Sequence, residues 1–233
     1  MTPPAAIPRK GRKDTRSRET QLRELLSPDA TAGTSKPVLS SLLTSHSWDR
    51  MDDLLDILGA QDKSEALTPD VWDLVLLGDS TYVELDEENH FTRYRKQTLD
   101  PEWSRSLPWA DAYREYADKF EHLARTDGRF WKPKTRVDGS PQKAERIFGM
   151  AADRRSFEGN GSPRWKIRAL YDAAKDLCAM DGSVRLARVS IYDTIGGLTL
   201  GELLLGSTPV DVPAIRNLIE ERTIGADAHP WSR

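Results

Sequence analysis

The chain has 233 residues, a formal net charge of −3 and a pI of about 5.9. This length fits one domain with additions, and the acidic balance excludes a polycation, so any contact with nucleic acid must come from local basic patches. The single cysteine, Cys178, excludes an internal disulfide and a cysteine metal cluster. No segment approaches the ~20 apolar residues of a membrane helix, and no apolar signal segment follows the basic N-terminus. We therefore expect a cytoplasmic protein without membrane contact.

The first 60 residues are predicted to hold a basic tail and short helices. Residues 1–18 are rich in proline, lysine and arginine, which is typical of a disordered tail. This tail is either simply solvated or an arm that touches phosphate, and we expect residues 19–233 to form a single domain. Leucines at helical spacing predict a helix over 19–27 and one or two helices over 38–60. The acids Asp52, Asp53 and Asp56 are interpreted as a solvent face rather than as metal ligands.

Residues 70–96 contain the most informative pattern. The apolar runs Trp72–Leu77 and Thr81–Leu85 flank the tripeptide Gly78-Asp79-Ser80, which indicates a β-hairpin. Because nearly every strand position is apolar, we expect the hairpin to be covered on both faces, at the centre of a sheet.

Three acids interrupt these apolar strands. Asp73 lies on the first strand, and Glu84 and Asp86 share one face of the second, because side chains alternate along a strand. Converging carboxylates are costly to bury unless a cation neutralises them, and oxygen ligands suit Mg²⁺ or Mn²⁺. The arrangement favours metal-assisted hydrolysis of a phosphodiester. The alternative is a surface hairpin whose acids are solvated.

The order acid, about ten residues, Glu-x-acid across two strands resembles the PD-(D/E)xK phosphodiesterase superfamily, which has the restriction-endonuclease-like fold. The resemblance implies that Asp73 and Glu84 bind the metal, and it puts Asp86 at the usual lysine position. There Asp86 would complete the metal sphere or orient water. The segment ELDEENH is similar to the Glu-x-Asp variant of the very-short-patch-repair branch, in which a histidine follows. His90, Lys96 or Lys166 could replace the missing lysine. Residues 70–96 also resemble an uncharacterised bacterial family.

Basic residues beyond the hairpin are candidates for contact with a nucleic-acid backbone. A helix is predicted over 91–99, and residues 100–162 are interpreted as a helical insertion with helices near 109–125 and 141–149. Between them lies a loop in which aromatic residues alternate with lysine and arginine, as in base stacking combined with phosphate neutralisation. These groups could instead pair with Glu87 and Glu88 or anchor a surface loop. The candidates for nucleic-acid binding are Arg93, Arg95, Lys96, Arg129, Trp131, Lys132, Lys134 and Lys166.

The C-terminal third is predicted to complete the sheet. Ser162-Pro163 begins a helix that ends at Asp181-Gly182, and an apolar strand follows over 184–192. A helix followed by a strand is the crossover that returns a chain to the same sheet. A short strand or helix over 198–206 and a last helix over 211–223 are also expected. The predicted fold class is α/β, with a restriction-endonuclease-like core of helix, central mixed-sheet hairpin, crossover helix and returning strand, plus the helical insertion.

These expectations lead to two functional hypotheses. The first is a Mg²⁺- or Mn²⁺-dependent nuclease, with DNA as the expected substrate, acting in repair or defence, with Asp73, Glu84, Asp86, His90 and Lys96 at its catalytic centre. The second is a catalytically inactive relative of the same fold that binds nucleic acid or assembles with a partner protein or a second copy. Substitution of Glu84 separates them, because only the first hypothesis requires its carboxylate.

Overall fold

The structure, a computed structural model, describes residues 17–33, 39–64, 71–124, 140–151, 157–206 and 209–225. Within these residues the chain forms a five-stranded mixed sheet in the order β1-β2-β3-β4-β7. Its strands are β1 (Ala30–Ala32), β2 (Leu74–Leu76), β3 (Thr81–Asp86), β4 (Leu186–Ser190) and β7 (Thr223–Ile224), and a separate hairpin pairs β5 (Thr194–Ile195) with β6 (Leu198–Thr199). The predicted α/β class is confirmed.

β2 and β3 form the expected antiparallel hairpin. Leu74 lies opposite Val83, and Leu76 lies opposite Thr81. The turn is closed by the carboxylate of Asp79, which accepts a hydrogen bond from the backbone N–H of Thr81 at 3.1 Å. β2 spans only Leu74–Leu76 and is shorter than predicted at both ends, so the prediction that Asp73 lies on this strand is wrong: Asp73 immediately precedes it.

Helix α7 (Pro163–Met180) makes the crossover between β3 and β4. β4 runs parallel to β3, with Tyr82 opposite Leu186 and Asp86 opposite Ser190. Ser162 occupies the N-cap position and Pro163 the first turn of α7, where a fixed φ and a missing N–H are tolerated. The predicted helix, its start and the returning strand are therefore confirmed.

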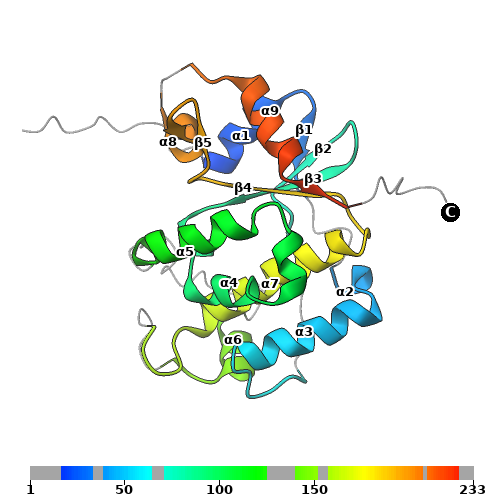
Figure 1. Cartoon of the computed structure of the whole chain (residues 1–233), viewed down its shortest axis with the longest axis vertical. Helices are drawn as coiled ribbons and strands as arrows, with labels where there is room; N and C mark the ends of the chain where they lie inside the picture. Colours follow the sequence, from blue (N-terminus) through cyan, green and yellow to red (C-terminus); the bar gives the residue numbers. More distant parts are fainter. Residues whose placement is uncertain are drawn as a thin grey trace, which may run out of the picture.

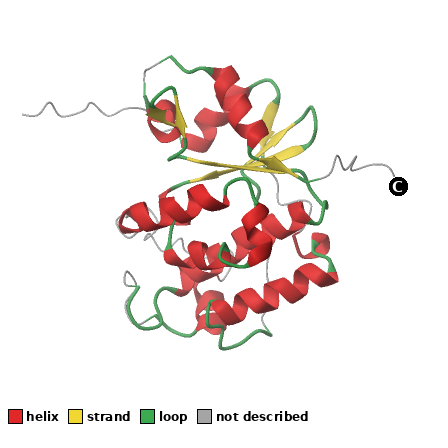
Figure 2. Ribbon diagram, viewed as in Figure 1, coloured by secondary structure: helices red, strands yellow, loops and turns green. Residues whose placement is uncertain are grey.

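Two apolar cores lie on opposite faces of the sheet. Helices α1 (Arg18–Leu26), α8 (Leu200–Leu205) and α9 (Val212–Glu221) cover one face, and α7 lies on the opposite side of the sheet together with the remaining helices (Figure 1). Figure 2 shows the strands as a thin layer between these two helical layers. Val83 and Leu85 of β3 belong to the first core, whereas Tyr82 packs against the second. Both faces of the hairpin are covered, as its sequence predicts.

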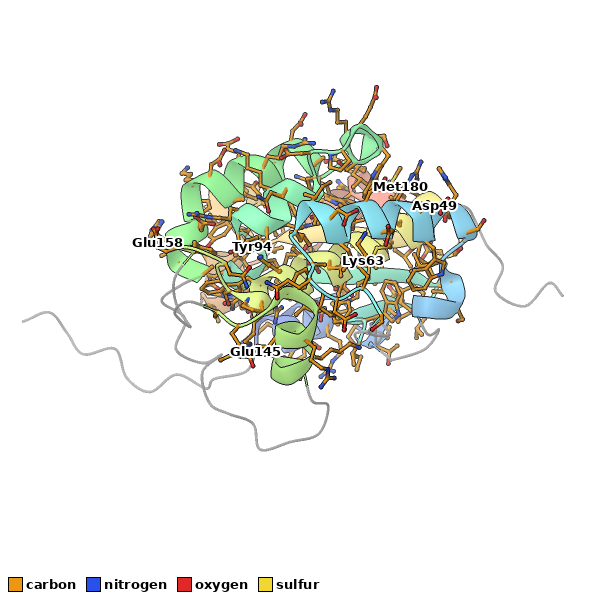
Figure 3. The ribbon with its side chains drawn as sticks, turned by 90° about the horizontal axis from the view of Figure 1, so that it is seen from below. Asp49, Lys63, Tyr94, Glu145, Glu158 and Met180 are labelled. Atoms are coloured by element: carbon orange, nitrogen blue, oxygen red, sulfur yellow. The ribbon has the colours of Figure 1, made fainter. Side chains whose placement is uncertain are left out.

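The helical layer beneath the sheet includes the predicted insertion. Besides α7, this layer contains α2 (Leu39–Leu42), α3 (Ser45–Ile57), η1 (Glu88–His90) and α4 (Arg93–Thr98). The predicted insertion adds η2 (Glu102–Ser106), α5 (Ala110–Ala124) and α6 (Ser140–Phe148). Trp109 and Tyr113 are fully buried in the second core, so the insertion is part of the main core and not an appendage. Lys63 (Figure 3) forms surface ion pairs with Asp52 and Asp56 of α3, as expected for a solvent face. None of the described helices is both long and apolar enough to span a membrane.

Candidate metal centre and the buried charge network

Asp73, Glu84 and Lys175 converge at the junction of β2, β3 and α7, and we call them the acidic centre. The backbone N–H of Leu85 donates to Asp73 Oδ2 at 3.0 Å, and the backbone N–H of Asp73 donates to Glu84 Oε1 at 3.4 Å. Lys175 Nζ, from α7, donates to Glu84 Oε2 at 2.7 Å. The two acids are therefore neighbours across the hairpin, as the sequence predicts, and the helix adds a cation beside them.

Burial leaves the acidic centre short of positive charge. Burial raises the pKa of Glu84 to about 8, with Lys175 opposing the shift and Asp73 adding to it. Burial also raises the pKa of Asp73 to about 6, against the opposing charge of Lys175. One ammonium group does not neutralise two carboxylates in a medium of low dielectric. Because Mg²⁺ and Mn²⁺ prefer carboxylate oxygens, the residues of this centre fit such an ion.

Asp86 belongs to a different cluster, which we call the arginine network. Arg188 Nη1, from β4, donates to both carboxylate oxygens of Asp86 at 2.9 and 2.8 Å, and the hydroxyl of Tyr113 donates to Oδ2 at 2.8 Å. Arg188 also pairs with Asp172 and Asp176 of α7 at 3.2 and 2.7 Å. All four charged groups are buried. Arg95, from α4, is also buried and donates from Nη2 to Asp176 Oδ2 at 2.7 Å. The network therefore consists of Asp86, Asp172, Asp176, Arg95 and Arg188.

His90 lies at the rim of the arginine network. Its Nδ1 is 2.9 Å from both Asp86 Oδ1 and Asp172 Oδ2, and Arg168 Nη1 lies 2.9 Å from its Nε2. Because arginine only donates, Nε2 must accept in this arrangement, which requires the neutral imidazole. Burial lowers the pKa of His90, but the two carboxylates outweigh burial and raise it to about 9. With a pKa of about 9, the imidazole carries both protons at neutral pH, so Nε2 does not then accept from Arg168 and the 2.9 Å approach is a contact between two cations.

Asp86, His90 and Asp172 each offer one ligand atom, and these atoms lie within 4.8 Å of one another, so this group could also hold a metal ion. Charge distinguishes it from the acidic centre. Burial raises the pKa of Asp86 and of Asp172, but Arg188 and His90 outweigh burial and hold both pKa values below the usual range. The carboxylates of Asp86 and Asp172 already have cationic partners, whereas Asp73 and Glu84 share only the single positive charge of Lys175. The charge balance of the two groups therefore differs: the carboxylates are paired with cations in one group and incompletely neutralised in the other.

Three of the residues predicted to contact nucleic acid make contacts within the protein instead. Arg95 is fully buried and pairs with Asp176 at 2.7 Å, so the prediction that it touches nucleic acid is wrong. Lys96 is held by Asp118 of α5 at 2.7 Å. Lys166 is buried, and its ammonium group lies 3.0 Å from Asn160 Oδ1.

The remaining candidates for nucleic-acid binding are one exposed arginine and four residues outside the described ranges. Arg93 is half exposed and pairs with Glu121 at 2.8 Å. Among the described residues, Glu87 and Glu88 pair with Arg18 of α1, whereas Arg93, Arg95 and Lys96 each pair with another acid. Four candidates, and the tail residues 1–16, lie outside the described residues: Arg129, Trp131, Lys132 and Lys134.

Sequence reasoning missed Lys175 and Arg188. The apolar stripe of α7 follows residues such as Leu170, Ala174 and Leu177, which places Lys175 among its polar positions. The helix is buried on nearly all sides, so its charged residues point into the molecule. Arg188 stands in an apolar strand, just as the acids of the hairpin do. A basic residue within one apolar strand and acidic residues within another together indicate a buried ion pair, and this was the signal in the sequence for Arg188.

These features define an α/β protein with a mixed sheet and two clusters of buried charge. The chain belongs to a family of unknown function, DUF7255, whose model matches residues 53–206. The matched segment contains all three residues of the acidic centre and the whole arginine network. No curated protein and no solved structure matches the chain.

Proposed function

We propose that the protein is a metal-dependent phosphodiester hydrolase with a restriction-endonuclease-like core, acting on nucleic acid with DNA as the expected substrate. The observation that carries the proposal is the convergence of Asp73, Glu84 and Lys175 on adjacent elements. The order of helix, antiparallel hairpin, crossover helix and parallel returning strand also supports it, because the PD-(D/E)xK resemblance implies the same order.

Each residue of the acidic centre has a role. Asp73 and Glu84 hold Mg²⁺ or Mn²⁺, and such an ion supplies a hydroxide nucleophile and charge stabilisation at the phosphate. Lys175 takes the role of the lysine that is missing from the hairpin motif: its ammonium group holds Glu84 in place and stabilises negative charge that develops beside it. Asp86, which stands at the motif's lysine position, serves as the buried partner of Arg188 and is not among the ligands that we propose.

The test combines metal binding with cleavage. Calorimetry measures Mg²⁺ and Mn²⁺ binding, and plasmid, single-stranded DNA and RNA are then incubated with the same samples. We expect wild-type protein to bind the ion and cleave DNA. Asp73→Asn and Glu84→Gln should lose binding and roughly a hundredfold or more of the cleavage rate, and Lys175→Gln should lose cleavage while retaining the ion. The exposed Glu102→Gln is the matched control.

Two other outcomes would decide against this proposal. Wild-type protein that binds neither ion excludes the metal centre. Wild-type protein that binds the ion and nucleic acid without cleaving any substrate identifies the inactive, nucleic-acid-binding relative of the fold. The burial of Glu84, which is only 2% exposed, favours this second candidate, because a substrate phosphate must approach an enclosed carboxylate.

A further inference from the structure

A hollow of about 420 Å³ lies at the C-terminal end of α7. Its apolar lining includes Leu107, Ala179, Ile224 and the partly exposed Met180, which is labelled in Figure 3. These residues come from three segments that are distant in sequence: the end of η2, the last turn of α7, and β7. Because apolar surface is more stable out of water, a side chain or ligand of matching size is stabilised by filling such a recess.

The polar side of the hollow carries negative charge. Asp181, the C-cap residue of α7, is among the lining residues. The hydroxyl of Thr44 donates to Asp181 Oδ2 at 2.6 Å, and the hydroxyl of Ser47 donates to the same oxygen, so Oδ1 can accept a further donor. The carbonyl end of a helix carries partial negative charge, and α7 has no basic residue in its last turn. The hollow therefore fits a group that combines an apolar body with a cation.

The last described range of the chain ends at this hollow. Gly225, which follows β7, is one of the lining residues. Its φ of +103° favours glycine, and an added Cβ would lie 2.1 Å from the carbonyl oxygen of Val184. β7 thus brings the chain directly to the hollow. Eight further residues, 226–233, follow in the sequence and lie outside the described residues.

The sequence after Gly225 contains both groups that the hollow fits. It reads ADAHPWSR, in which Trp231 is the large apolar side chain and Arg233 is a cation. Trp231 comes six residues after Gly225, and six extended residues span up to about 20 Å, which is enough for a loop that returns to its starting point. Side chains two residues apart on an extended segment point to the same side, about 7 Å from each other. Trp231 and Arg233 can therefore reach the apolar lining and Asp181 together.

We propose that residues 226–233 fold back onto the end of α7, with Trp231 filling the hollow and Arg233 paired with Asp181. The covalent connection favours this occupant over a separate ligand, because a short tether gives the indole ring an effective concentration on the order of millimolar. The docked segment anchors the end of the helix that carries Lys175.

Disulfide trapping in the full chain tests this contact. Ser106 lines the hollow and is exposed, and Ser232 lies between the two residues that we propose to dock. The pair Ser106→Cys/Ser232→Cys should therefore cross-link within one molecule under mild oxidation. The matched control is Thr194→Cys/Ser232→Cys, because Thr194 is exposed and follows the end of β4 that is opposite to Val184. The native Cys178 is buried, and burial raises the pKa of its thiol to about 12, so it does not compete.

The rates of cross-linking are normalised to the reaction of each thiol with a small disulfide reagent. The Ser106 pair should then react at least about tenfold faster than the control pair. Trp231→Ala should remove this difference, and Trp231→Phe should retain most of it. Arg233→Gln should slow the Ser106 pair several-fold at low salt and less at high salt, because salt screens an exposed ion pair.

The other outcomes decide against this inference. Equal normalised rates for the two pairs overturn it, as does a fast Ser106 pair that is insensitive to Trp231→Ala. A rate that is unchanged by Arg233→Gln overturns the pairing with Asp181. Cross-linked dimers that form faster at higher protein concentration identify a second copy of the chain as the occupant, which also overturns the inference. Circular dichroism checks that each variant is folded.

Discussion

The carboxyl group of Glu84 has a raised pKa because it is buried beside too little positive charge. Its pKa in the folded protein is about 8, against an ordinary value of 4.5. Between these two values the folded state keeps a proton that the unfolded chain has released. The stabilisation linked to this group is therefore fully present below pH 4.5 and is lost as pH rises through 8. Asp73, with a pKa of about 6, acts in the same direction over a lower range.

Glu84→Gln should remove this pH dependence. The amide imitates the protonated carboxyl group and cannot ionise, so the variant keeps its stability where the wild type loses it. Between pH 4.5 and 8 the free energy of unfolding of the wild type should fall by on the order of 4 kcal/mol more than that of the variant. Urea unfolding at a series of pH values, without metal, measures the difference. Glu102→Gln should follow the wild type, and parallel curves for Glu84→Gln and wild type would contradict the burial argument.

At the scale of elements, Arg188 joins β4 to β3 and to α7. Its guanidinium contacts Asp86 on the neighbouring strand and two acids on the helix that crosses over it. Removal of one partner from a buried ionic cluster leaves uncompensated charge, which costs more than the intact cluster contributes. The network therefore ties the docking of α7 to the pairing of the parallel strands.

Arg188→Met should destabilise the protein by about 3–5 kcal/mol, because it leaves Asp86 and Asp176 without their common cation. Chemical denaturation at neutral pH measures the loss. Arg185→Met, on the same segment, removes a partly exposed pair with Asp79 and should cost less than about 1 kcal/mol. Equal small losses in both variants would show that the network does not hold the elements together.

The difference between what could and could not be predicted also lies at this scale. The closeness of Asp73 to Glu84 could be predicted, because it follows from strand alternation and a short turn, which are local features. The structure confirms it. Asp86 was grouped with them on the same pattern, but its partner Arg188 is about a hundred residues away. Arg95 is predicted to contact nucleic acid because it belongs to the basic run that follows the acidic hairpin, whereas α4 packs against α7 and turns this side chain toward Asp176. Contacts between distant elements decide such cases, and a local pattern does not contain them.

For the whole molecule, the sheet is shared by two cores. Residues before the hairpin, such as Leu22, pack on one face with α9, while Trp109 and Tyr113 of the insertion pack on the other face. Tyr113 also donates to Asp86 in the centre of the sheet. Neither helical layer can separate without exposing the strands, so the described parts of the chain should unfold together.

A thermal scan of the full chain should give one transition. We expect far-ultraviolet circular dichroism, which follows the helices, and tryptophan fluorescence, which follows the layer of Trp72 and Trp109, to yield the same midpoint. Deletion of residues 100–162 should abolish cooperative unfolding, because it removes buried core. Two separated midpoints, or a deletion variant that unfolds cooperatively, would mean that the insertion is an independent unit.

The parallel pairing of β3 with β4 has a consequence for the order of synthesis. β3 leaves the ribosome about a hundred residues before its partner strand does, which at ~5–20 residues per second is an interval of roughly 5–20 s. During that interval the edge of β3 has no neighbour, and the cations that later surround Glu84 and Asp86 have not yet been made. Both carboxylates are then ionised in water, and charges on an open strand edge oppose pairing with another nascent chain. The same acids thus protect the unfinished polypeptide from aggregation.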